Sequence, residues 1–368
     1  MTVERRRLLV VSPRPPRPDG RGDQRRASVA VAALSKEWDL DVCSWLPDVG
    51  ARGLNRWRTG PLFPFKALGL AAVRPVGAAY VQAMLPKKMR LQMRSEEYDH
   101  VLFVTDRAVP CFQPPGFFLD FVDDLGGGAL RRSGATRGPA SAFWRLEGRR
   151  IRRLDRKLAS RARVAIACNP VDAQSISPAV KVVPLAAAAG PMPEKGDRIV
   201  FLGNLFYVPN HEAAMWICEH LAPELSAREV DPSRIVVAGR RPRRKLLTSA
   251  RNAGVSIRAD PEDLSEILQE ASVVLAPMVL GSGTQYKILD AVGAGRPCVV
   301  SPLANAGLNL VDGRSAMICE REPKPFADAV LRLLTDEDLR QAIATGARVD
   351  LNSNMAEPVH TAWCAALL

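Results

Sequence analysis

The sequence lacks the long apolar runs and metal-ligand spacings that mark several large protein classes. No uninterrupted apolar stretch among its 368 residues reaches the ~20 residues that a membrane-spanning helix needs. The apolar run after Arg7 is short and no small-residue cleavage site follows it, so we expect a buried first strand there and not a signal peptide. The four histidines have no metal-ligand spacing and no loop carries an Asp-x-Asp pair, so we expect no metal site.

The sequence also shows no disulfide pattern and no nucleic-acid-binding motif. The seven cysteines are odd in number and scattered, without any Cys-x-x-Cys pair, which favours a reducing cytoplasm and no disulfide framework. The net charge of +12 comes largely from arginines spread through helices, as in residues 146–163. A solvated helix face explains that charge better than a polyanion-binding surface does, and no nucleic-acid-binding motif accompanies it.

What the chain does contain is a regular alternation of strand and helix patterns, which predicts an α/β fold with parallel sheets. We expect strands over 6–12, 39–46, 100–105, 117–124, 163–168 and 180–186, then over 198–204, 234–239, 255–259, 272–278, 298–302 and 315–320. The principal helices are expected over 24–37, 141–162, 210–222, 263–271, 323–346 and 354–367. The segment 186–198 is the best linker candidate. The prediction is two Rossmann-like domains, 1–190 and 191–353, with helix 354–367 packing back on the first.

One region of the first half is less regular. Residues 48–98 contain an apolar stretch with basic flanks that Arg74 and Pro75 interrupt. Two interpretations stay open: an interfacial or acceptor-side segment, or a plain buried helix pair. The buried pair is favoured because alanine and glycine dominate the apolar residues.

The most informative stretch runs from 272 to 302 and reads as a strand, a Gly-Ser-Gly-Thr loop, a helix and a second strand. Gly281 and Gly283 allow a sharp turn and a close approach to a ligand. We expect Thr284 to cap the following helix, with Lys287 in its first turn and Asp290 one turn further on. A helix N-terminus beside a lysine suits phosphate, and a carboxylate there suits a sugar's hydroxyl pair. The stretch therefore predicts a nucleotide-sugar site.

The second half resembles family 4 bacterial glycosyltransferases of the GT-B fold. The matching stretches are FLGNLFYVPNHEAAMWI, VVAGRRP, GSGTQYKILDAVGAGRPCVVSP and AGLNLVDGRSAMI, over about 150 residues with the segment that follows. PRPPRPDGRGDQRR resembles the first acceptor-side loop more loosely. The resemblance implies two Rossmann-like domains whose sheets face each other across a cleft. It also implies a retaining, metal-independent transferase, of hexosyltransferase type, that needs no cofactor beyond its nucleotide-sugar donor.

The resemblance also implies residue roles. Lys287 would contact the diphosphate and Asp290 the ribose, while the loop residues Gly281, Ser282, Gly283 and Thr284 would offer backbone N–H groups. Gly203 and Asn204 would approach the phosphates or sugar, and Arg240 the base or phosphate. In the first half, Gly22 and Asp23 would face donor sugar and acceptor, with Arg25 or Arg26 near phosphate. Asp123 or Asp124 stands where many members have a catalytic-side histidine, so Asp23, Asp123 and Lys287 are the catalytic candidates.

The chain also departs from the family pattern. Ser282 and Ala306 stand where acidic residues are common, and the Gly-Asn loop lacks the usual Arg/Lys pair. A subgroup with the same GSGT loop shares Ser282 and Lys287, so these changes do not indicate an inactive enzyme. The missing acid at Ala306 leaves the sugar open.

We therefore expect transfer of a sugar from a UDP-, GDP- or TDP-linked donor to an acceptor hydroxyl or other nucleophile, in bacterial polysaccharide or natural-product biosynthesis. The acceptor is a small molecule or a lipid-linked glycan, and no nucleic acid partner is expected. The expected location is the cytoplasm, with peripheral contact at the inner membrane face left open. The alternatives are a nucleotide-sugar epimerase or hydrolase, and a non-catalytic basic protein that binds polyanions or membrane.

Overall fold

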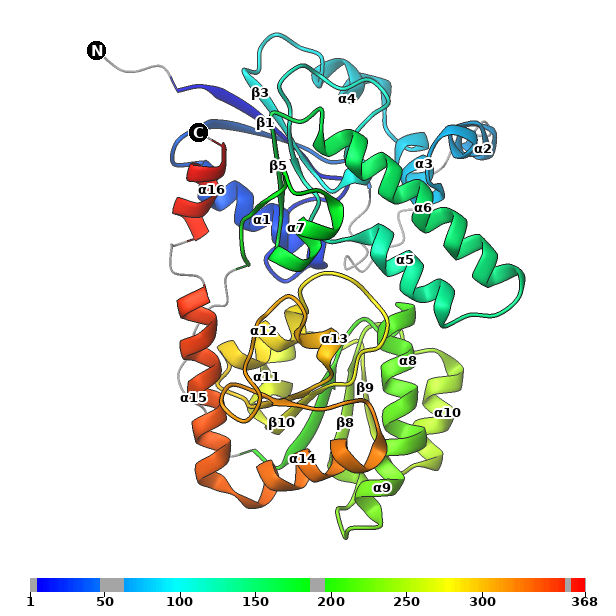
Figure 1. Ribbon diagram of the computed structural model, residues 1–368, viewed down its shortest axis with the longest axis vertical. Coiled ribbons are helices and arrows are strands. Elements are labelled where there is room, and N and C mark those ends of the chain that lie inside the picture. The colour runs from blue at the N-terminus through cyan, green and yellow to red at the C-terminus, as the bar shows by residue number, and fades with distance from the viewer. Residues whose placement is uncertain (1–4, 47–62, 186–195, 355–358, 368) are drawn as a thin grey trace. The chain divides into compact units, whose positions relative to one another are not determined.

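The computed structural model describes residues 5–46, 63–185, 196–354 and 359–367, which fall into two compact units (Figure 1). The first unit comprises Met1–Leu185 and Glu357–Leu368, and the second comprises Ala186–Ala356. Each unit has a six-stranded parallel sheet with helices packed around it, so the predicted α/β class is confirmed. Most of the expected linker, 186–195, lies outside the described residues. No described helix is long and apolar enough to cross a membrane.

The described residues of the first unit form six strands at positions close to the expected ones, and helices between them. Its strands are β1 (Arg7–Val11), β2 (Asp39–Cys43), β3 (His100–Val104), β4 (Phe118–Asp120), β5 (Val164–Ala167) and β6 (Lys181–Val182). Its helices are α1 (Gly22–Leu34), α2 (Phe63–Val73), α3 (Val76–Ala83), α4 (Lys87–Gln92), the 3-10 turn η1 (Asp106–Ala108), α5 (Leu125–Gly134), α6 (Pro139–Ala159), α7 (Pro170–Ile176) and α16 (Val359–Leu367).

The first sheet has the strand order β2-β1-β3-β4-β5-β6 and is covered on both faces. Alternate residues of β1 enter two different apolar clusters, Leu8 and Val10 on one face and Leu9 and Val11 on the other. Such double burial explains why the strands read as continuous apolar runs in the sequence. The strand order reverses between β1 and β3, and ligands of open α/β sheets bind at such a reversal, beyond the carboxyl ends of the strands.

The second unit repeats this architecture. Its strands are β7 (Arg198–Leu202), β8 (Ile235–Gly239), β9 (Ser256–Ala259), β10 (Ala271–Ala276), β11 (Cys298–Val300) and β12 (Met317–Ile318). Its helices are α8 (Val208–Trp216), the π-turn η2 (Ile217–Leu221), α9 (Ala222–Ser226), the 3-10 turn η3 (Pro232–Arg234), α10 (Arg244–Asn252), α11 (Leu264–Gln269), α12 (Tyr286–Gly293), α13 (Pro302–Asn305), α14 (Pro323–Thr335) and α15 (Glu337–Asn354).

The second sheet has the order β12-β11-β10-β7-β8-β9, which is the Rossmann order. The order reverses between β7 and β10, the first and fourth strands of this unit. The loops that leave the carboxyl ends of these two strands carry the Gly-Asn and Gly-Ser-Gly-Thr motifs. The topology therefore places both motifs at the ligand-binding point of a Rossmann sheet.

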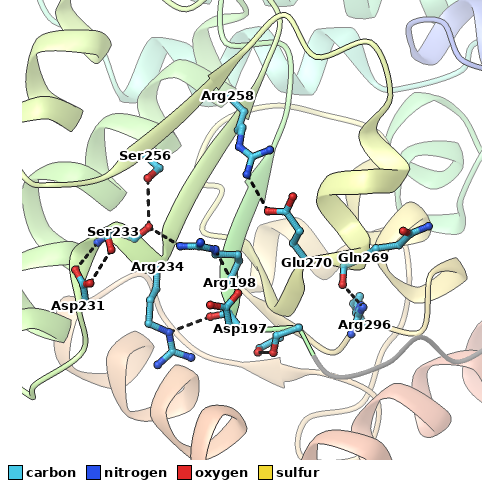
Figure 2. Close-up of polar contacts among 12 residues, drawn as sticks. Asp197, Arg198, Asp231, Ser233, Arg234, Ser256, Arg258, Gln269, Glu270 and Arg296 are labelled. Carbon is cyan, nitrogen blue, oxygen red and sulfur yellow. Dashed lines mark hydrogen bonds and ion pairs between the residues drawn. The ribbon is translucent and has the colours of Figure 1, made fainter.

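The opposite, amino edge of this sheet is closed by polar contacts (Figure 2). Arg234, just before β8, donates from Nε to the carbonyl of Asp197 at 2.9 Å. Arg198, the first residue of β7, donates from Nη1 to the carbonyl of Ser233 at 3.2 Å, and Ser256 of β9 donates to the same carbonyl. These contacts join the starts of β7, β8 and β9, so the polar residues at the amino edge stabilise the sheet.

Two sequence predictions differ from the structure. The strand expected over 117–124 ends at Asp120, because Val122 adopts a φ of +67° and Asp124 caps α5 through its carboxylate. The irregular region 48–98 forms three helices, α2, α3 and α4, of which α2 is largely exposed. The favoured prediction of a plain buried helix pair is therefore wrong for α2; residues 48–62 lie outside the described part.

Candidate functional site

The candidate site lies at the carboxyl edge of the second sheet, where two loops leave neighbouring strands. One loop follows β7 and carries Gly203 and Asn204; the other follows β10 and leads through Gly281 and Gly283 into α12. Gly281 has a φ of +119° and Gly283 a φ of +76°, values that L side chains rarely adopt. The glycines therefore permit the turn that brings this loop back to the start of α12.

The start of α12 differs in one detail from the prediction. The helix begins at Tyr286 and its N-cap residue is Gln285, so the expectation that Thr284 caps the helix is wrong. Lys287 is nevertheless in the first turn, as expected. Ser282 and Thr284 lie half-buried in the loop just before it.

Lys287 is the most unusual side chain of the site. It is only 8% exposed, and its ammonium Nζ donates to Oδ1 of Asn210 at 2.6 Å. The same nitrogen lies 3.4 Å from Sδ of Met278 and 4.6 Å from the centre of the Phe201 ring. Within the described residues it has no carboxylate partner, so a buried cation is held by a neutral amide, a thioether and an aromatic face.

This environment changes the acidity of the lysine. Burial lowers the pKa of Lys287 from 10.5 to about 7, because desolvation disfavours the charged form and no counter-charge opposes it. An anion placed beside Nζ would favour the charged form and reverse that shift. The charge of Lys287 therefore depends on what lies beside its Nζ.

Asn210 and Gly203 connect the two loops. Asn210 lies in the first turn of α8 and donates from Nδ2 to the carbonyl of Asn204 at 3.2 Å, while its Oδ1 accepts from Lys287. A Cβ at position 203 would lie 2.8 Å from Cγ of Asn210, so any side chain there would displace this amide. Sequence reasoning placed Gly203 and Asn204 but missed Asn210; a glycine at a strand end was the signal that another group packs against it.

A second close approach stiffens the same loop. Gly239, the last residue of β8, has a φ of +152°, and a Cβ there would lie 1.6 Å from the carbonyl oxygen of Gly203. The amide of Gly203 in turn donates to the carbonyl of Ala238 at 3.1 Å. The two glycines let β7 and β8 stay paired up to the point where both chains turn away.

Asp290 lies one helical turn after Lys287 and is partly buried. Its position three residues after Lys287 puts both side chains on the same side of α12, as the sequence spacing predicts. The ribose role of Asp290 stays a prediction.

Arg240 follows β8 and is exposed. The neighbouring arginines are more closely integrated: Arg241 stacks at 4.2 Å over the ring of Phe206, and Arg243 donates from Nη2 to the Phe206 carbonyl at 2.8 Å. Phe206 belongs to the Gly-Asn loop, which lacks the expected Arg/Lys pair. The loop after β8 therefore supplies positive charge beside the loop after β7.

In the first unit, Gly22 and Asp23 are the first two residues of α1. Oδ2 of Asp23 accepts from Nη1 of Arg14 at 2.7 Å, and both side chains are about four-fifths buried, with exposures of 21% and 23%. The pair fixes the loop between β1 and α1 at the carboxyl edge of the sheet. The catalytic role of Asp23 stays a prediction.

Arg26 does not have the role expected for it near phosphate. It is fully buried and pairs from Nε with Oδ2 of Asp120, also fully buried, at 2.6 Å. Its Nη1 donates to the carbonyl of Pro184 at 3.0 Å, and its guanidinium lies 4.7 Å from the ring centre of Trp363 in α16. Arg26 therefore joins α1, β4 and the C-terminal helix inside the core.

Asp123 lies in a turn after β4 and is half-buried, with its amide donating to the carbonyl of Phe121. The backbone around it is strained, since Val122 has a φ of +67° and Thr105, after the neighbouring β3, has a φ of +74°. Such outliers in non-glycine residues gather at functional positions. Asp124, the other candidate here, caps α5 and accepts from Ser175, so of the two we retain Asp123.

A buried carboxyl lies behind this turn. Asp155 of α6 is 2% exposed, and burial together with the charge of Asp106 raises its pKa well above the ordinary value. A hydrogen bond between the side chains of Asp155 and Asp106 raises that pKa further. Sequence patterns could not reveal this pair, because Asp106 lies in η1 and Asp155 in α6.

Comparison with known proteins identifies the second unit. Residues 196–336 match the family model described as Glycosyl transferases group 1. No curated protein matches the sequence. The matched range includes both loops of the candidate site and α12.

Solved structures of low sequence identity show the same fold over nearly the whole chain. Sucrose-phosphate synthase from Thermosynechococcus elongatus is 12% identical with a TM-score of 0.66, covering 95% of this chain and 94% of that chain. HepE of Anabaena, solved with UDP-glucose, is 12% identical with a TM-score of 0.62, covering 98% of each chain. The α,α-trehalose-phosphate synthase (UDP-forming) from Burkholderia vietnamiensis is 14% identical with a TM-score of 0.61, covering 99% and 97%. Residues 196–336 of the second unit thus match a group 1 glycosyl transferase domain, and the chain as a whole has the GT-B fold of these solved structures.

Proposed function

We propose that this protein is a glycosyltransferase, which moves a sugar from a nucleotide-diphosphate sugar to an acceptor hydroxyl with retention at the anomeric carbon. The observation that carries the donor class is Lys287, a buried lysine without a carboxylate partner in the described chain, at the start of the helix that follows a glycine loop. A diphosphate would supply the missing negative charge. HepE was solved with UDP-glucose, which supports the same donor class for this chain.

In the proposed mechanism the leaving diphosphate gains charge as the glycosidic bond breaks. Protonated Lys287 and the N–H groups at the start of α12 stabilise that charge, which is the largest contribution such a site makes to the rate. Asp290 holds the ribose hydroxyls. The departing phosphate itself accepts the acceptor's proton on the front face, so no enzyme nucleophile is required.

The proposal includes no metal, because Lys287 and the helix start carry the positive charge that the diphosphate requires. Asp23 and Asp123 of the first unit are proposed to face the donor sugar and acceptor. The proposed setting is bacterial polysaccharide or natural-product biosynthesis, with UDP-, GDP- and TDP-linked sugars as the donors to be tested.

Calorimetric titration with UDP-, GDP- and TDP-sugars tests the donor class. We expect one nucleotide to bind, and Lys287→Ala to weaken its binding at least tenfold. Lys245→Ala, which removes an exposed lysine of α10 in the same unit, is the matched control and should bind normally. The donor assignment is refuted if no nucleotide sugar binds the wild type, or if Lys287→Ala binds the nucleotide sugar as tightly as Lys245→Ala does.

Product analysis tests the reaction. With acceptor present, the anomeric configuration of the product by NMR should equal that of the donor. An inverted product refutes retention. Conversion of the donor without any acceptor would instead indicate an epimerase or a hydrolase.

A further inference from the structure

The first unit carries an apolar and basic surface that the donor site does not explain. Three side chains of α2 are almost fully exposed although they are large and apolar: Phe65 at 73%, Leu68 at 72% and Val73 at 76%. Exposed apolar residues of α4, the loop after η1 and α6 extend the set: Leu91, Phe112, Phe143 and Leu146. We call these seven residues and the cations among them the α2–α6 surface. Hydrogen bonds join α6 to the end of α2, and one cavity is lined by Leu70 of α2, Arg90 of α4 and Phe112. Large exposed apolar side chains gathered on neighbouring elements mark interaction sites.

The α2–α6 surface is held in place by hydrogen bonds to backbone groups. Arg150 of α6 donates from Nη2 to the carbonyls of Ala71 and Arg74, at the end of α2. Glu147 of α6 accepts from the amide of Val76 at 2.5 Å, and Arg74 donates to the carbonyl of Val109 at 2.7 Å. The exposure of α2 therefore belongs to a fixed arrangement, and Figure 1 shows α2 as the outermost helix beyond α3 and α6.

The charge of this surface has one sign. Residues 63–92, which form α2, α3 and α4, contain five lysines and arginines and no aspartate or glutamate. Lys66, Lys87 and Lys88 are exposed and form no ion pair within the described chain. On α6, Arg145 and Arg149 are exposed as well. The cations thus surround the apolar side chains without internal counter-charges.

A small cavity of about 180 Å³ adjoins the same elements. Its lining includes Leu70 of α2, Arg90 of α4, Arg94 and Phe112. The Arg94 guanidinium lies 4.2 Å from the ring centre of Phe112. Apolar walls with two arginines offer room for an acyl segment or glycerol backbone beside a phosphate.

We propose that the α2–α6 surface docks on an anionic phospholipid bilayer. The exposed apolar side chains enter the headgroup and acyl boundary, while the surrounding lysines and arginines contact lipid phosphates. A second copy of this chain is a poorer occupant, because a two-fold contact would bring these cations against one another. The surface lies in the first unit, so its lipid binding is independent of donor binding by Lys287 in the second.

Vesicle co-sedimentation tests the proposal with the whole chain and without any nucleotide. Vesicles of phosphatidylcholine with 30% phosphatidylglycerol, chosen as about a third anionic lipid, should bind the protein at low salt; vesicles of phosphatidylcholine alone should bind it much more weakly. The double variant Lys87→Gln with Lys88→Gln removes two cations. At about 1 kcal/mol of lipid attraction per lysine, its binding should be about thirtyfold weaker. Phe65→Ser with Leu68→Ser and Val73→Ser should weaken binding at least tenfold, with the cations intact.

Matched controls are available because other apolar and cationic residues are also exposed. Val311→Ser with Leu247→Ser in the second unit, and Lys245→Gln with Lys324→Gln, should leave vesicle binding unchanged. Circular dichroism should show that the α2 variant melts within a few degrees of the wild type, since its substitutions are at exposed positions. The proposal is overturned if anionic vesicles are not bound, or if the α2 variant binds them as the wild type does. It is also overturned if light scattering shows a dimer that the α2 substitutions dissociate.

Discussion

The buried Lys287 predicts that donor binding takes up a proton and weakens as the pH rises. In the free protein burial lowers the pKa of this ammonium to about 7. A bound diphosphate restores the counter-charge and raises the pKa again. The nucleotide sugar itself is a diphosphate diester and does not titrate between pH 6 and 8, so the lysine is the group that changes its protonation.

The size of the effect follows from that pKa. The protonated fraction of a group with a pKa of about 7 falls from about 0.9 at pH 6 to about 0.1 at pH 8. If only the protonated form binds the diphosphate, the dissociation constant rises about tenfold over this range, or about 1.4 kcal/mol. At pH 8 each binding event should take up about 0.9 proton.

Calorimetry in buffers of different ionisation enthalpy measures both quantities. The observed binding enthalpy at pH 8 should differ between Tris and phosphate in proportion to the proton taken up. Lys287→Arg keeps the charge at all these pH values, so whatever its affinity, its pH dependence should be flat. An affinity of the wild type that stays constant from pH 6 to 8, with no buffer dependence, would refute the reasoning about Lys287.

Three further predictions concern stability and the loop geometry. Lys287→Met should stabilise the free protein by about 1–3 kcal/mol at pH 7, because it removes a buried cation that lacks a counter-charge. The folded-state pKa is below the unfolded one, so wild-type stability rises from pH 7 towards 10.5 and the difference should shrink, as thermal melts would show. Asp120→Ala should cost about 3–5 kcal/mol in urea unfolding, since it leaves Arg26 buried without its carboxylate. Gly203→Ala should displace the Asn210 amide and weaken donor binding about tenfold in calorimetry, with little change in melting temperature.

The Asp120→Ala and Gly203→Ala variants each have a control. Arg17→Ala removes an ion pair in which Asp19 is mostly exposed, and should cost less than about 1 kcal/mol. Gly134→Ala adds a Cβ where nothing lies within 4 Å, and should bind donor normally. A Lys287→Met protein that is less stable than the wild type at pH 7, or an Asp120→Ala protein as stable as it, would contradict the corresponding argument.

The parts of the fold that follow from local pattern were predictable. The strands on either side of α12, β10 and β11, are continuous apolar runs bounded by glycine loops. The alternation of such strands with helices along the chain predicts parallel sheets. The GSGT loop and Lys287 were found because their neighbours in sequence are also their neighbours in space. Boundaries failed where side chains decided them: Asp124 caps α5 and shortens the expected strand, and Gln285 precedes α12 in place of Thr284.

The contacts that the sequence did not reveal join distant residues. Lys287 and Asn210 are 77 positions apart, and Arg26 and Asp120 are 94 apart. No periodicity or spacing records such pairs, and Arg26 in particular ends the basic stretch PRPPRPDGRGDQRR, which resembles an acceptor-side loop in sequence although Arg26 lies in α1. The exposure of α2 was missed for a related reason: its alanines and glycine are compatible with burial, and only its packing against α3 determines which side chains remain outside.

The two edges of the second sheet show why the sequence points to the carboxyl edge as the candidate site. At the amino edge, charged and polar residues close the starts of the strands by pairing with one another, as Arg234 does with the Asp197 carbonyl. At the carboxyl edge, glycines replace side chains, so that Gly239 packs on Gly203 and Gly203 on the Asn210 amide. A chain that only needed a stable sheet would have no reason to keep glycine at positive φ there or to bury a lysine without an anion, because both cost folding free energy. These costs are offset only when a ligand brings negative charge to Lys287, and that requirement connects the proposed donor class to the pH dependence of its binding.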